Sequence, residues 1–267
     1  MGQCLSPGVR VREYNSIKGE RTQIYPCGKC AKCRQRKTSQ WVFRLCREAE
    51  ISSSVAFITL TYEVSPFSAN RLQTLQKSDV QKFIKRFRHQ NFKKIKYYCV
   101  GEYGPNTYRP HYHLIMFNID QIYFRKPEKL AQIWDLGHIQ IGQAEPSAFA
   151  YVSGYTQKEG IKVGEHDQDD RQPEFSMMSK KMGLNYLTPQ MIKYYRNHQL
   201  TALKGPGGKF ISMPRYYKEK IFTKRELNKI GEEIQEHMSL IENLTHDDII
   251  SQMRTEKRKL KFKKQKL

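Results

Sequence analysis

The chain has few acidic residues: 26 Asp and Glu stand against 47 Lys and Arg, which gives a formal net charge of +21 over 267 residues. This excess of basic side chains indicates a polyanionic partner. No apolar run approaches the length of about 18 residues that spans a bilayer, and no signal-peptide apolar segment opens the chain. The glycine-rich segment at 205–208 lacks the Lys-Ser/Thr ending of a phosphate-binding loop, and no helicase motif is visible. We therefore expect a soluble, cytoplasmic protein without a membrane partner.

Cysteine is also sparse, and its placement argues against a disulfide framework. Cys27, Cys30 and Cys33 form a C-x-x-C-x-x-C run, and three further cysteines are scattered along the chain. In a cytoplasmic protein of this size, three such thiolates with Cys4 or Cys46 as a fourth can form a tetrahedral zinc site that fastens the N-terminal arm. Free thiols in a basic loop are the alternative interpretation.

Two histidines, His111 and His113, stand directly before an apolar run. On a β-strand, residues at i and i+2 point to the same face of the sheet. Two imidazoles placed in this way can bind one divalent cation, Mg²⁺ or Mn²⁺, and leave positions for a carboxylate, water and substrate oxygens. A hairpin that turns at residues 104–107 would bring Glu102 beside them as a third ligand. A strand with one exposed and one packed histidine is the alternative.

A predicted helix downstream carries Tyr151, Tyr155 and Lys158 on one face, with the two tyrosines one turn, about 6 Å, apart along its axis. An ordinary amphipathic helix that buries two aromatic rings beside a lysine is the alternative. Gly154 interrupts this helix at a cost of about 1 kcal/mol relative to alanine. It indicates a place where something, such as a DNA backbone, comes close.

Five segments carry a family resemblance: the cysteine run at 26–34, the strand at 57–62, Glu102 with the histidine pair, the tyrosine segment at 151–158, and residues 174–181. In this order they resemble the HUH endonucleases, and among them the rolling-circle replication initiators of microviruses of the gokushovirus type. The resemblance covers roughly residues 4 to 185, and the joint order is more specific than any one motif.

The resemblance implies a viral initiator that nicks origin DNA by tyrosine attack, which leaves a 5′-phosphotyrosine and a free 3′-hydroxyl. The second tyrosine would cut the regenerated origin while the first linkage is rejoined, releasing circular single-stranded genomes. The implied partners are single-stranded origin DNA of the phage, a host helicase and a host DNA polymerase, in the host bacterial cytoplasm. The implied site has a Mg²⁺ or Mn²⁺ ion bound by His111, His113 and Glu102, and Tyr151, Tyr155 and Lys158 as catalytic residues.

Two other functions stay open at this point. In a non-enzymatic zinc-containing nucleic-acid-binding protein, the histidines would be packing residues and the tyrosines would stack on bases or in the core. In a metal-dependent nuclease that uses water, the histidine pair would be needed and the tyrosines would not.

The hydrophobic pattern predicts an α+β fold, a two-layer sandwich with a central, mainly antiparallel sheet. We expect helices at 38–51 and 78–91, strands at 55–62 and 138–141, a histidine strand in the centre of the sheet, and the tyrosine helix packed across it. The predicted organisation is a Cys-rich basic arm and helix at 1–50, the catalytic core at 51–185, a connecting segment at 186–222, and a helical extension with a basic tail at 223–267.

The predicted DNA contacts come from Arg109 and from the basic tail. A helix with so dense a block of lysines and arginines should fray in solution. Its side chains should add phosphate contacts that do not depend on DNA sequence. Sixteen tyrosines and 13 phenylalanines also offer flat surfaces for unpaired bases. The tail residues concerned are Lys257, Arg258, Lys259, Lys261, Lys263 and Lys264.

Overall fold

The structure is a computed structural model, and it describes the chain except for residues 1–3, 5–7, 14–19, 156–167, 206–207 and 242–267. The chain folds into two compact units, residues 41–186 and residues 1–40 together with 187–267. The predicted division into four domains stays a prediction. No helix in the described part of the chain is long and apolar enough to cross a bilayer.

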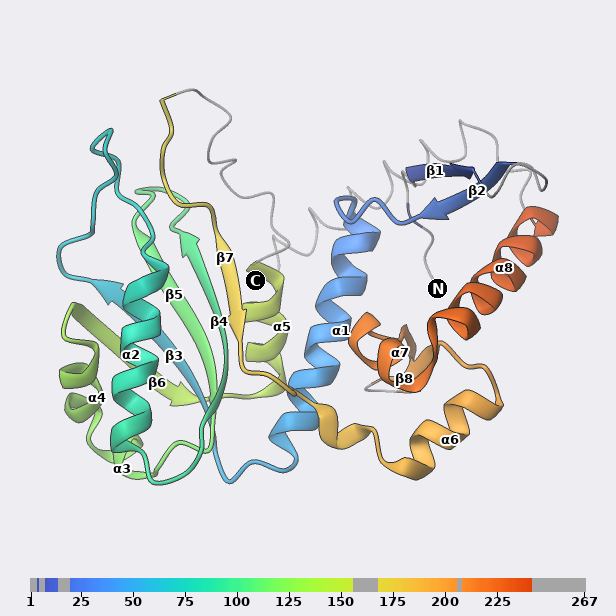
Figure 1. Cartoon of the computed structure of the whole chain (residues 1–267). Helices are drawn as coiled ribbons and strands as arrows, with labels where there is room; N and C mark the ends of the chain where they lie inside the picture. Colours follow the sequence, from blue (N-terminus) through green and yellow to red (C-terminus); the bar gives the residue numbers. More distant parts are fainter. Residues whose placement is uncertain (1–3, 5–7, 14–19, 156–167, 206–207, 242–267) are drawn as a thin grey trace. The chain divides into compact units, whose positions relative to one another are not determined.

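A five-stranded antiparallel sheet forms the centre of the unit 41–186, with the strand order β6-β3-β5-β4-β7 (Figure 1). The histidine strand therefore lies in the middle, as the sequence predicts. The predicted α+β class with a central antiparallel sheet is confirmed. The strands are β3 (Val55–Tyr62), β4 (Lys96–Tyr103), β5 (Pro110–Phe117), β6 (Gly137–Gln143) and β7 (Phe175–Met178).

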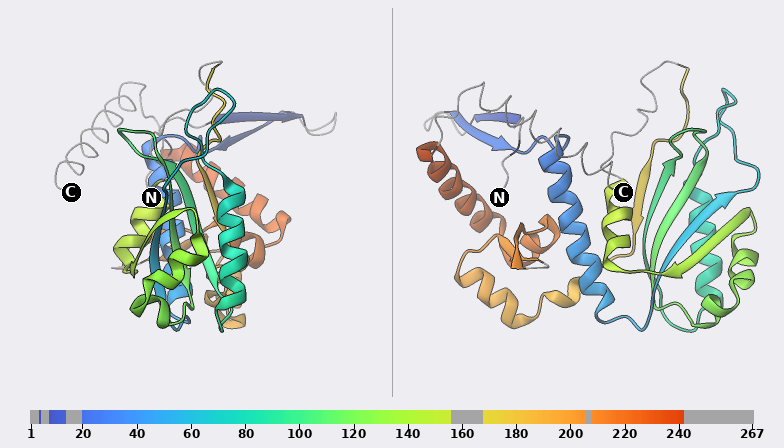
Figure 2. Two further views of the ribbon diagram at one scale, coloured as in Figure 1. Left: turned by 90° about the vertical axis from the view of Figure 1, so that its left-hand side faces the viewer. Right: turned by 180° about the vertical axis from the view of Figure 1, so that it is seen from behind.

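Helices lie on both faces of this sheet (Figures 1 and 2). Three of them, α2, α3 and α4, lie on one face, whereas α5 and the part of α1 from Trp41 onward pack on the other. The bounds are α1 (Ala31–Ala49), α2 (Lys77–Gln90), α3 (Ile122–Arg125), α4 (Pro127–Trp134) and α5 (Pro146–Tyr155).

The larger core lies between the sheet and α2. The apolar face of this helix is buried against alternate residues of β3 and β5, because neighbouring side chains on a strand point to opposite faces. Tyr112 closes this core at its polar end: its hydroxyl lies 2.8 Å from the Tyr62 hydroxyl and accepts a hydrogen bond of 2.7 Å from the Gln76 backbone N–H, just before α2 begins.

The opposite face of the sheet is apolar over only part of its area. Tyr98, Ile115 and Phe117 are buried there against Phe149 and Val152 of α5. Glu48 on α1, only 2% exposed, accepts hydrogen bonds from Lys96 Nζ at 2.7 Å and from the Gly183 backbone N–H at 2.8 Å. The polar residues of this face lie near the end of β4 and the start of β5, beyond the area that these apolar side chains cover.

Two elements differ from the sequence prediction. Helix α1 begins at Ala31 rather than near residue 38, directly after the turn at Gly28, whose positive φ of 76° suits glycine. Strand β7 at the sheet edge was not predicted, because four residues are too few to show a period.

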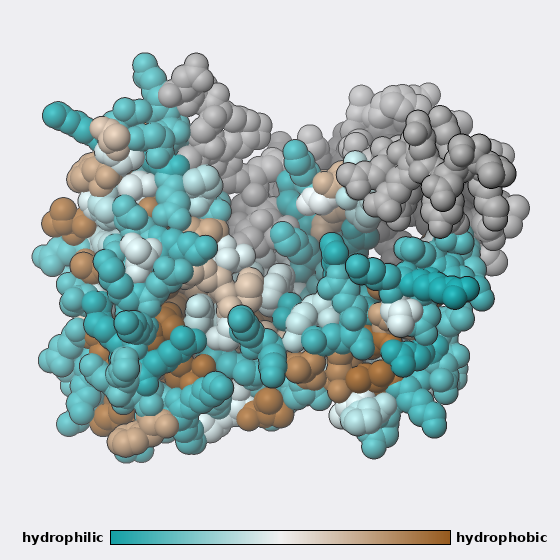
Figure 3. Space-filling model, viewed as in Figure 1, coloured by the Kyte–Doolittle hydropathy of each residue, from teal (hydrophilic) through white to brown (hydrophobic). Residues whose placement is uncertain are grey.

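The other unit combines short strands with helices. Helix α8 has a capping box at its start, where Glu226 accepts from the Thr223 N–H and Thr223 Oγ1 accepts from the Glu226 N–H. Hydrophilic side chains cover most of the described surface on the face drawn in Figure 3. Its elements are β1 (Gly8–Glu13), β2 (Glu20–Tyr25), α6 (Pro189–Asn197), β8 (Ala202–Lys204), β9 (Phe210–Ser212), α7 (Arg215–Ile221) and α8 (Lys224–Ile241).

Candidate active site

The register of the central hairpin places Glu102 next to the histidine pair. Glu102 on β4 lies directly opposite His111 on β5, and His113 lies two residues further along the same strand. Opposite residues of an antiparallel pair share a face, so all three side chains project from the same side of the sheet. This is the face on which α5 packs.

His113 is held by hydrogen bonds at both ring nitrogens. Its Nε2 lies 3.0 Å from Glu102 Oε1, and its Nδ1 lies 3.1 Å from Thr59 Oγ1 on the neighbouring strand β3. His113 and Glu102 are each only 8% exposed. The Phe57 ring stacks nearly parallel to the imidazole, with centroids 5.8 Å apart and an interplanar angle of 8°. The imidazole therefore has a defined orientation.

The donor set fits a divalent cation with nitrogen and oxygen ligands. Two atoms bound to one Mg²⁺ ion at right angles lie about 3 Å apart, which matches the separation of His113 Nε2 from Glu102 Oε1. Burial lowers the pKa of His111, and the neighbouring His113 and Arg109 lower it further, while Glu102 opposes them. His111 is thereby favoured in the neutral form that can bind a metal. In the described part of the chain, however, only the four N-terminal cysteines bring three or more ligand atoms within 4.8 Å of one another.

Tyr151 lies against this polar group. It projects from α5, and its ring meets the His113 and Phe57 rings edge-on, with centroids 5.9 Å and 6.2 Å away. The tyrosine remains 53% exposed, so a substrate can reach it. Burial and the charge of Glu102 raise the pKa of its phenol. A tyrosine and a possible metal-binding pair thus lie within ring-contact distance on one face of the sheet.

The structure describes only some of the remaining predicted site residues. Tyr155 is the last residue of α5. Lys158 and the basic tail lie outside the described residues. The Arg109 guanidinium donates to the backbone carbonyl of Tyr62 at the end of β3. Its predicted DNA contact stays a prediction, and part of its hydrogen-bonding capacity serves the fold.

One comparison with known proteins covers this same region. Residues 55–160, which run from β3 past α5, match the family model of the replication-associated protein ORF2/G2P. The chain is 28% identical to the replication-associated protein VP4 of Bdellovibrio phage phiMH2K over 221 residues, 29% identical to the replication-associated protein ORF2 of Spiroplasma virus 4 over 215, and 25% identical to ORF4 of Chlamydia phage 1 over 216. The chain is thus similar to phage replication-associated proteins, which supports a microvirus-type replication protein. No solved structure matches it.

These alignments cover 72–73% of this chain and 66%, 66% and 52% of the three relatives. The chain therefore spans slightly less than two thirds of the length of the first two replication-associated proteins and about half of the third. These matches confirm the predicted resemblance to phage replication proteins. They say nothing of individual site residues.

Several residues around the candidate site were not predicted to have a role. Thr59 and Phe57 belong to the strand motif at 57–62, whose sequence offers no sign that it contacts His113. Glu174 accepts a hydrogen bond of 3.1 Å from the backbone N–H of Tyr103, the residue after Glu102. The segment at 174–181, whose role the sequence leaves open, thus supports the edge of β4 through Glu174 and β7. Only the antiparallel pairing reveals these contacts.

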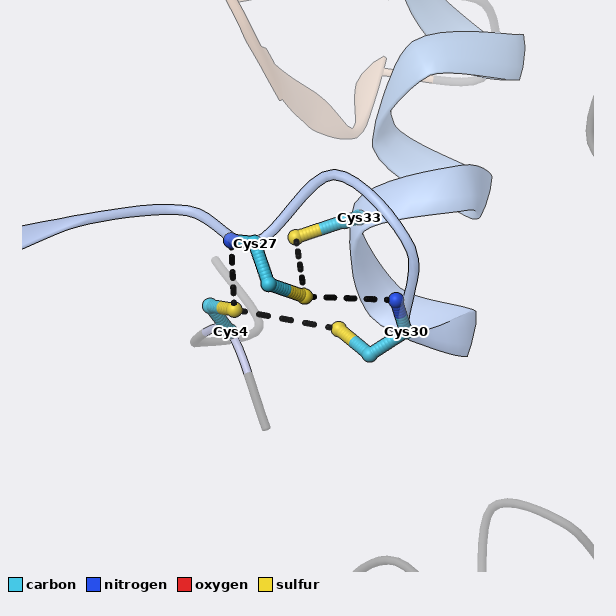
Figure 4. Close-up of side chains that lie close together, drawn as sticks. All are labelled: Cys4, Cys27, Cys30 and Cys33. Atoms are coloured by element: carbon cyan, nitrogen blue, oxygen red, sulfur yellow. Dashed lines mark hydrogen bonds between the residues drawn. The ribbon is translucent and has the colours of Figure 1, made fainter. Parts of the chain in front are cut away.

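The N-terminal cysteines form a second candidate site, and here the structure selects the fourth residue. Cys27, Cys30 and Cys33, which come from the loop before α1 and its first turn, gather with Cys4, so Cys46 is not needed (Figure 4). The Sγ atoms of Cys4 and Cys30 are 3.8 Å apart, and those of Cys27 and Cys33 are 4.0 Å apart. Four sulfurs at about 2.3 Å from one zinc ion would have such separations.

The two sides of this cluster differ in acidity. The backbone N–H of Cys30 donates to Cys27 Sγ at 3.3 Å, and this contact is the main cause that lowers the pKa of Cys27 to about 6. Burial raises the pKa of Cys33 to about 12. Arg36 donates to Cys33 Sγ at 3.6 Å and would offset part of the negative charge of a four-thiolate site. The chemistry of this donor set suits a structural zinc ion.

Proposed function

We propose that this protein initiates rolling-circle replication of a small phage genome by nicking origin DNA with a tyrosine nucleophile. The observation that carries the proposal is the meeting of Tyr151 with His113 and Glu102 on one face of the central sheet. A purely structural aromatic contact would not require a buried carboxylate hydrogen-bonded to a buried histidine at the same place. The similarity to phage replication-associated proteins supports the same function.

The proposed step exchanges one phosphate ester for another. The Tyr151 phenol oxygen attacks the phosphorus of the scissile phosphodiester and loses its proton, while the bond from phosphorus to the 3′-oxygen breaks. The 3′-oxygen takes up a proton, and the 5′-phosphate stays bound to the tyrosine. No oxidant or further substrate is consumed. The free 3′-hydroxyl can be extended by a polymerase.

His113, Glu102 and, from the facing register position, His111 would hold a Mg²⁺ or Mn²⁺ ion. Such a cation, when bound, stabilises negative charge on the scissile phosphate. The protein side chains have their own tasks. Burial and the charge of Glu102 raise the pKa of Tyr151, which favours the protonated phenol in the free protein. Lys158, in the segment that follows α5, is proposed to favour the phenolate form of the tyrosine, in addition to the cation.

Tyr155 is proposed as the second nucleophile, because one turn of α5 separates it from Tyr151. After one round of synthesis it would cut the regenerated origin while the new 3′-hydroxyl attacks the first phosphotyrosine. The phosphate then returns to DNA and the first tyrosine is released. Two tyrosines thus allow nicking and strand joining in one protein.

The other parts of the chain have proposed roles in binding. The four cysteines would hold a structural zinc ion, and Arg109 with the basic tail would contact phosphates. The proposed partners are single-stranded origin DNA of the phage, a host helicase and a host polymerase, in the host bacterial cytoplasm. A zinc-containing binding protein without catalysis and a water-using nuclease are the competing functions.

The test uses labelled single-stranded DNA that carries the phage origin, with Mn²⁺ or Mg²⁺ and the full chain, analysed on a denaturing gel. We expect DNA joined covalently to protein. The adduct should vanish in the Tyr151→Phe, Tyr155→Phe double variant and in His111→Ala, whereas Tyr194→Phe, an exposed tyrosine of the other unit, should behave as the wild type.

The alternatives give different gels. Cleavage that leaves no adduct and that persists in the double variant would support the water-using nuclease. Binding without any cleavage, from a folded protein, would support the zinc-containing binding protein.

A further inference from the structure

Strand β3 contacts His113 from the side opposite Glu102. Thr59 lies directly across from His113 in the β3–β5 register, and its Oγ1 is 3.1 Å from Nδ1. Phe57, two residues earlier on the same face, stacks on the imidazole. The imidazole of His113 therefore contacts a carboxylate at Nε2, a hydroxyl at Nδ1 and, nearly parallel to its plane, the Phe57 ring.

The Glu102 carboxylate and a bound cation favour different positions of the ring proton. A neutral imidazole carries one proton, and a carboxylate can only accept a hydrogen bond. Charge-assisted hydrogen bonds are the stronger ones, so the Glu102 carboxylate favours the proton on Nε2 in the metal-free protein. A cation bound through Nε2 needs the lone pair of that nitrogen, and the proton must then sit on Nδ1.

Threonine suits both arrangements, because a hydroxyl has one proton to donate and lone pairs to accept. Thr59 Oγ1 can donate to Nδ1 when the proton is on Nε2 and can accept from Nδ1 when a cation holds Nε2. Valine has nearly the same shape but neither property. With valine, the Nδ1–H of this buried histidine would lose its acceptor in the metal-bound form.

We propose that Thr59 is a positioning residue for His113, whose hydroxyl changes from donor to acceptor when a divalent cation binds at Nε2. The proposal rests on the proposed function, since it assumes that His113 and Glu102 bind the cation. It assigns to the strand motif at 57–62 a role in metal affinity: Phe57 fixes the ring plane and Thr59 stabilises the tautomer that binds metal.

The first test is the tautomer itself, measured on the wild-type chain labelled with ¹⁵N-histidine. Long-range ¹H–¹⁵N spectra distinguish a proton on Nδ1 from one on Nε2. We expect His113 to carry its proton on Nε2 without added cation and on Nδ1 with saturating Mg²⁺. A proton that stays on Nε2 with Mg²⁺ bound would overturn the proposal, and this measurement needs no variant.

The second test is Mn²⁺ affinity, measured from the signal of free Mn²⁺ in electron paramagnetic resonance. Removing a partner that orients a metal-bound histidine typically weakens metal affinity by about 10- to 100-fold. We expect a loss of this size in Thr59→Val and near wild-type affinity in Thr59→Ser, which restores the hydroxyl. Thr61→Val, on the same face of β3 but opposite His111, is the matched control and should lose less. Thermal melting shows that each variant is folded.

The outcomes separate the two proposals. Wild-type protein that binds no Mn²⁺ at His111 and Glu102, as judged by the variants His111→Ala and Glu102→Gln, would overturn the metal-assisted function and this inference with it. Wild-type protein that binds Mn²⁺ together with a Thr59→Val variant of unchanged affinity would overturn only the role of Thr59.

Discussion

Replacing Gly154 by alanine should stabilise the protein and impair its proposed reaction. Gly154 is the penultimate residue of α5, and a Cβ added to it would meet no atom of the described residues within 4 Å. Glycine inside a helix costs about 0.5 to 1 kcal/mol relative to alanine, and near the helix end the lower figure, about 0.5 kcal/mol, applies. For a chain of this size, that gain corresponds to a rise in Tm of about 1 to 2 °C.

The effect on nicking has the opposite sign. Gly154 stands three residues after Tyr151 and so shares its helix face, next to the proposed nucleophile. A methyl group there would displace a DNA backbone that approaches Tyr151, and a misplacement of about 1 Å at a reacting centre can cost on the order of 100-fold. We expect single-turnover formation of the DNA–protein adduct to slow by about 10- to 100-fold.

The assays are thermal melting and adduct formation under excess enzyme, on the same preparations. Ala150→Gly is the control: at this exposed helix position, glycine should lower Tm while the rate of adduct formation is retained. A Gly154→Ala variant that forms adduct at the wild-type rate would refute the idea that this glycine makes room for DNA. A fall in Tm would show that the space beside Gly154 is not open.

Three further predictions concern stability and the cysteine cluster. Glu48→Ala should destabilise the protein by about 3 kcal/mol in urea unfolding, because Lys96 loses its buried carboxylate partner, and Glu48→Gln by less; equal losses would contradict this account. Tyr112→Phe should cost about 1 to 3 kcal/mol in the same assay, because the hydrogen bond that its hydroxyl accepts at the start of α2 is lost; no change would show that water replaces it. In zinc-free protein, alkylation followed by mass spectrometry should modify Cys27 rapidly at pH 7 and more slowly below pH 6. The reason is that the pKa of Cys27 is lowered to about 6 and that the thiolate is the reactive form. Cys33, with a pKa raised to about 12, should react far more slowly. Added zinc should protect both cysteines.

The strongest sequence patterns were sufficient to predict the main elements around the site. The β-branched run at 55–62 and the apolar run after His113 predicted two central strands, and the turn-forming residues 104–107 predicted the hairpin that carries Glu102 across from His111. Both patterns are local, because a strand and a tight turn depend on residues close together in the chain. The start of α1 and the edge strand β7 were missed, since the first depends on where the preceding loop ends and the second on a partner strand far away in the sequence.

The sequence by itself determined the basic charge, the α+β class, the order of the motifs, and the candidates for metal binding and nucleophilic attack. The tertiary structure decided which of them meet. It brought Tyr151 to His113, placed Thr59 and Phe57 around the same ring, and selected Cys4 over Cys46 as the fourth cysteine. The physical reason is that these contacts join residues from separate strands, helices and loops. Their proximity follows from sheet register and from the packing of α5 and the N-terminal arm, which no single stretch of sequence encodes.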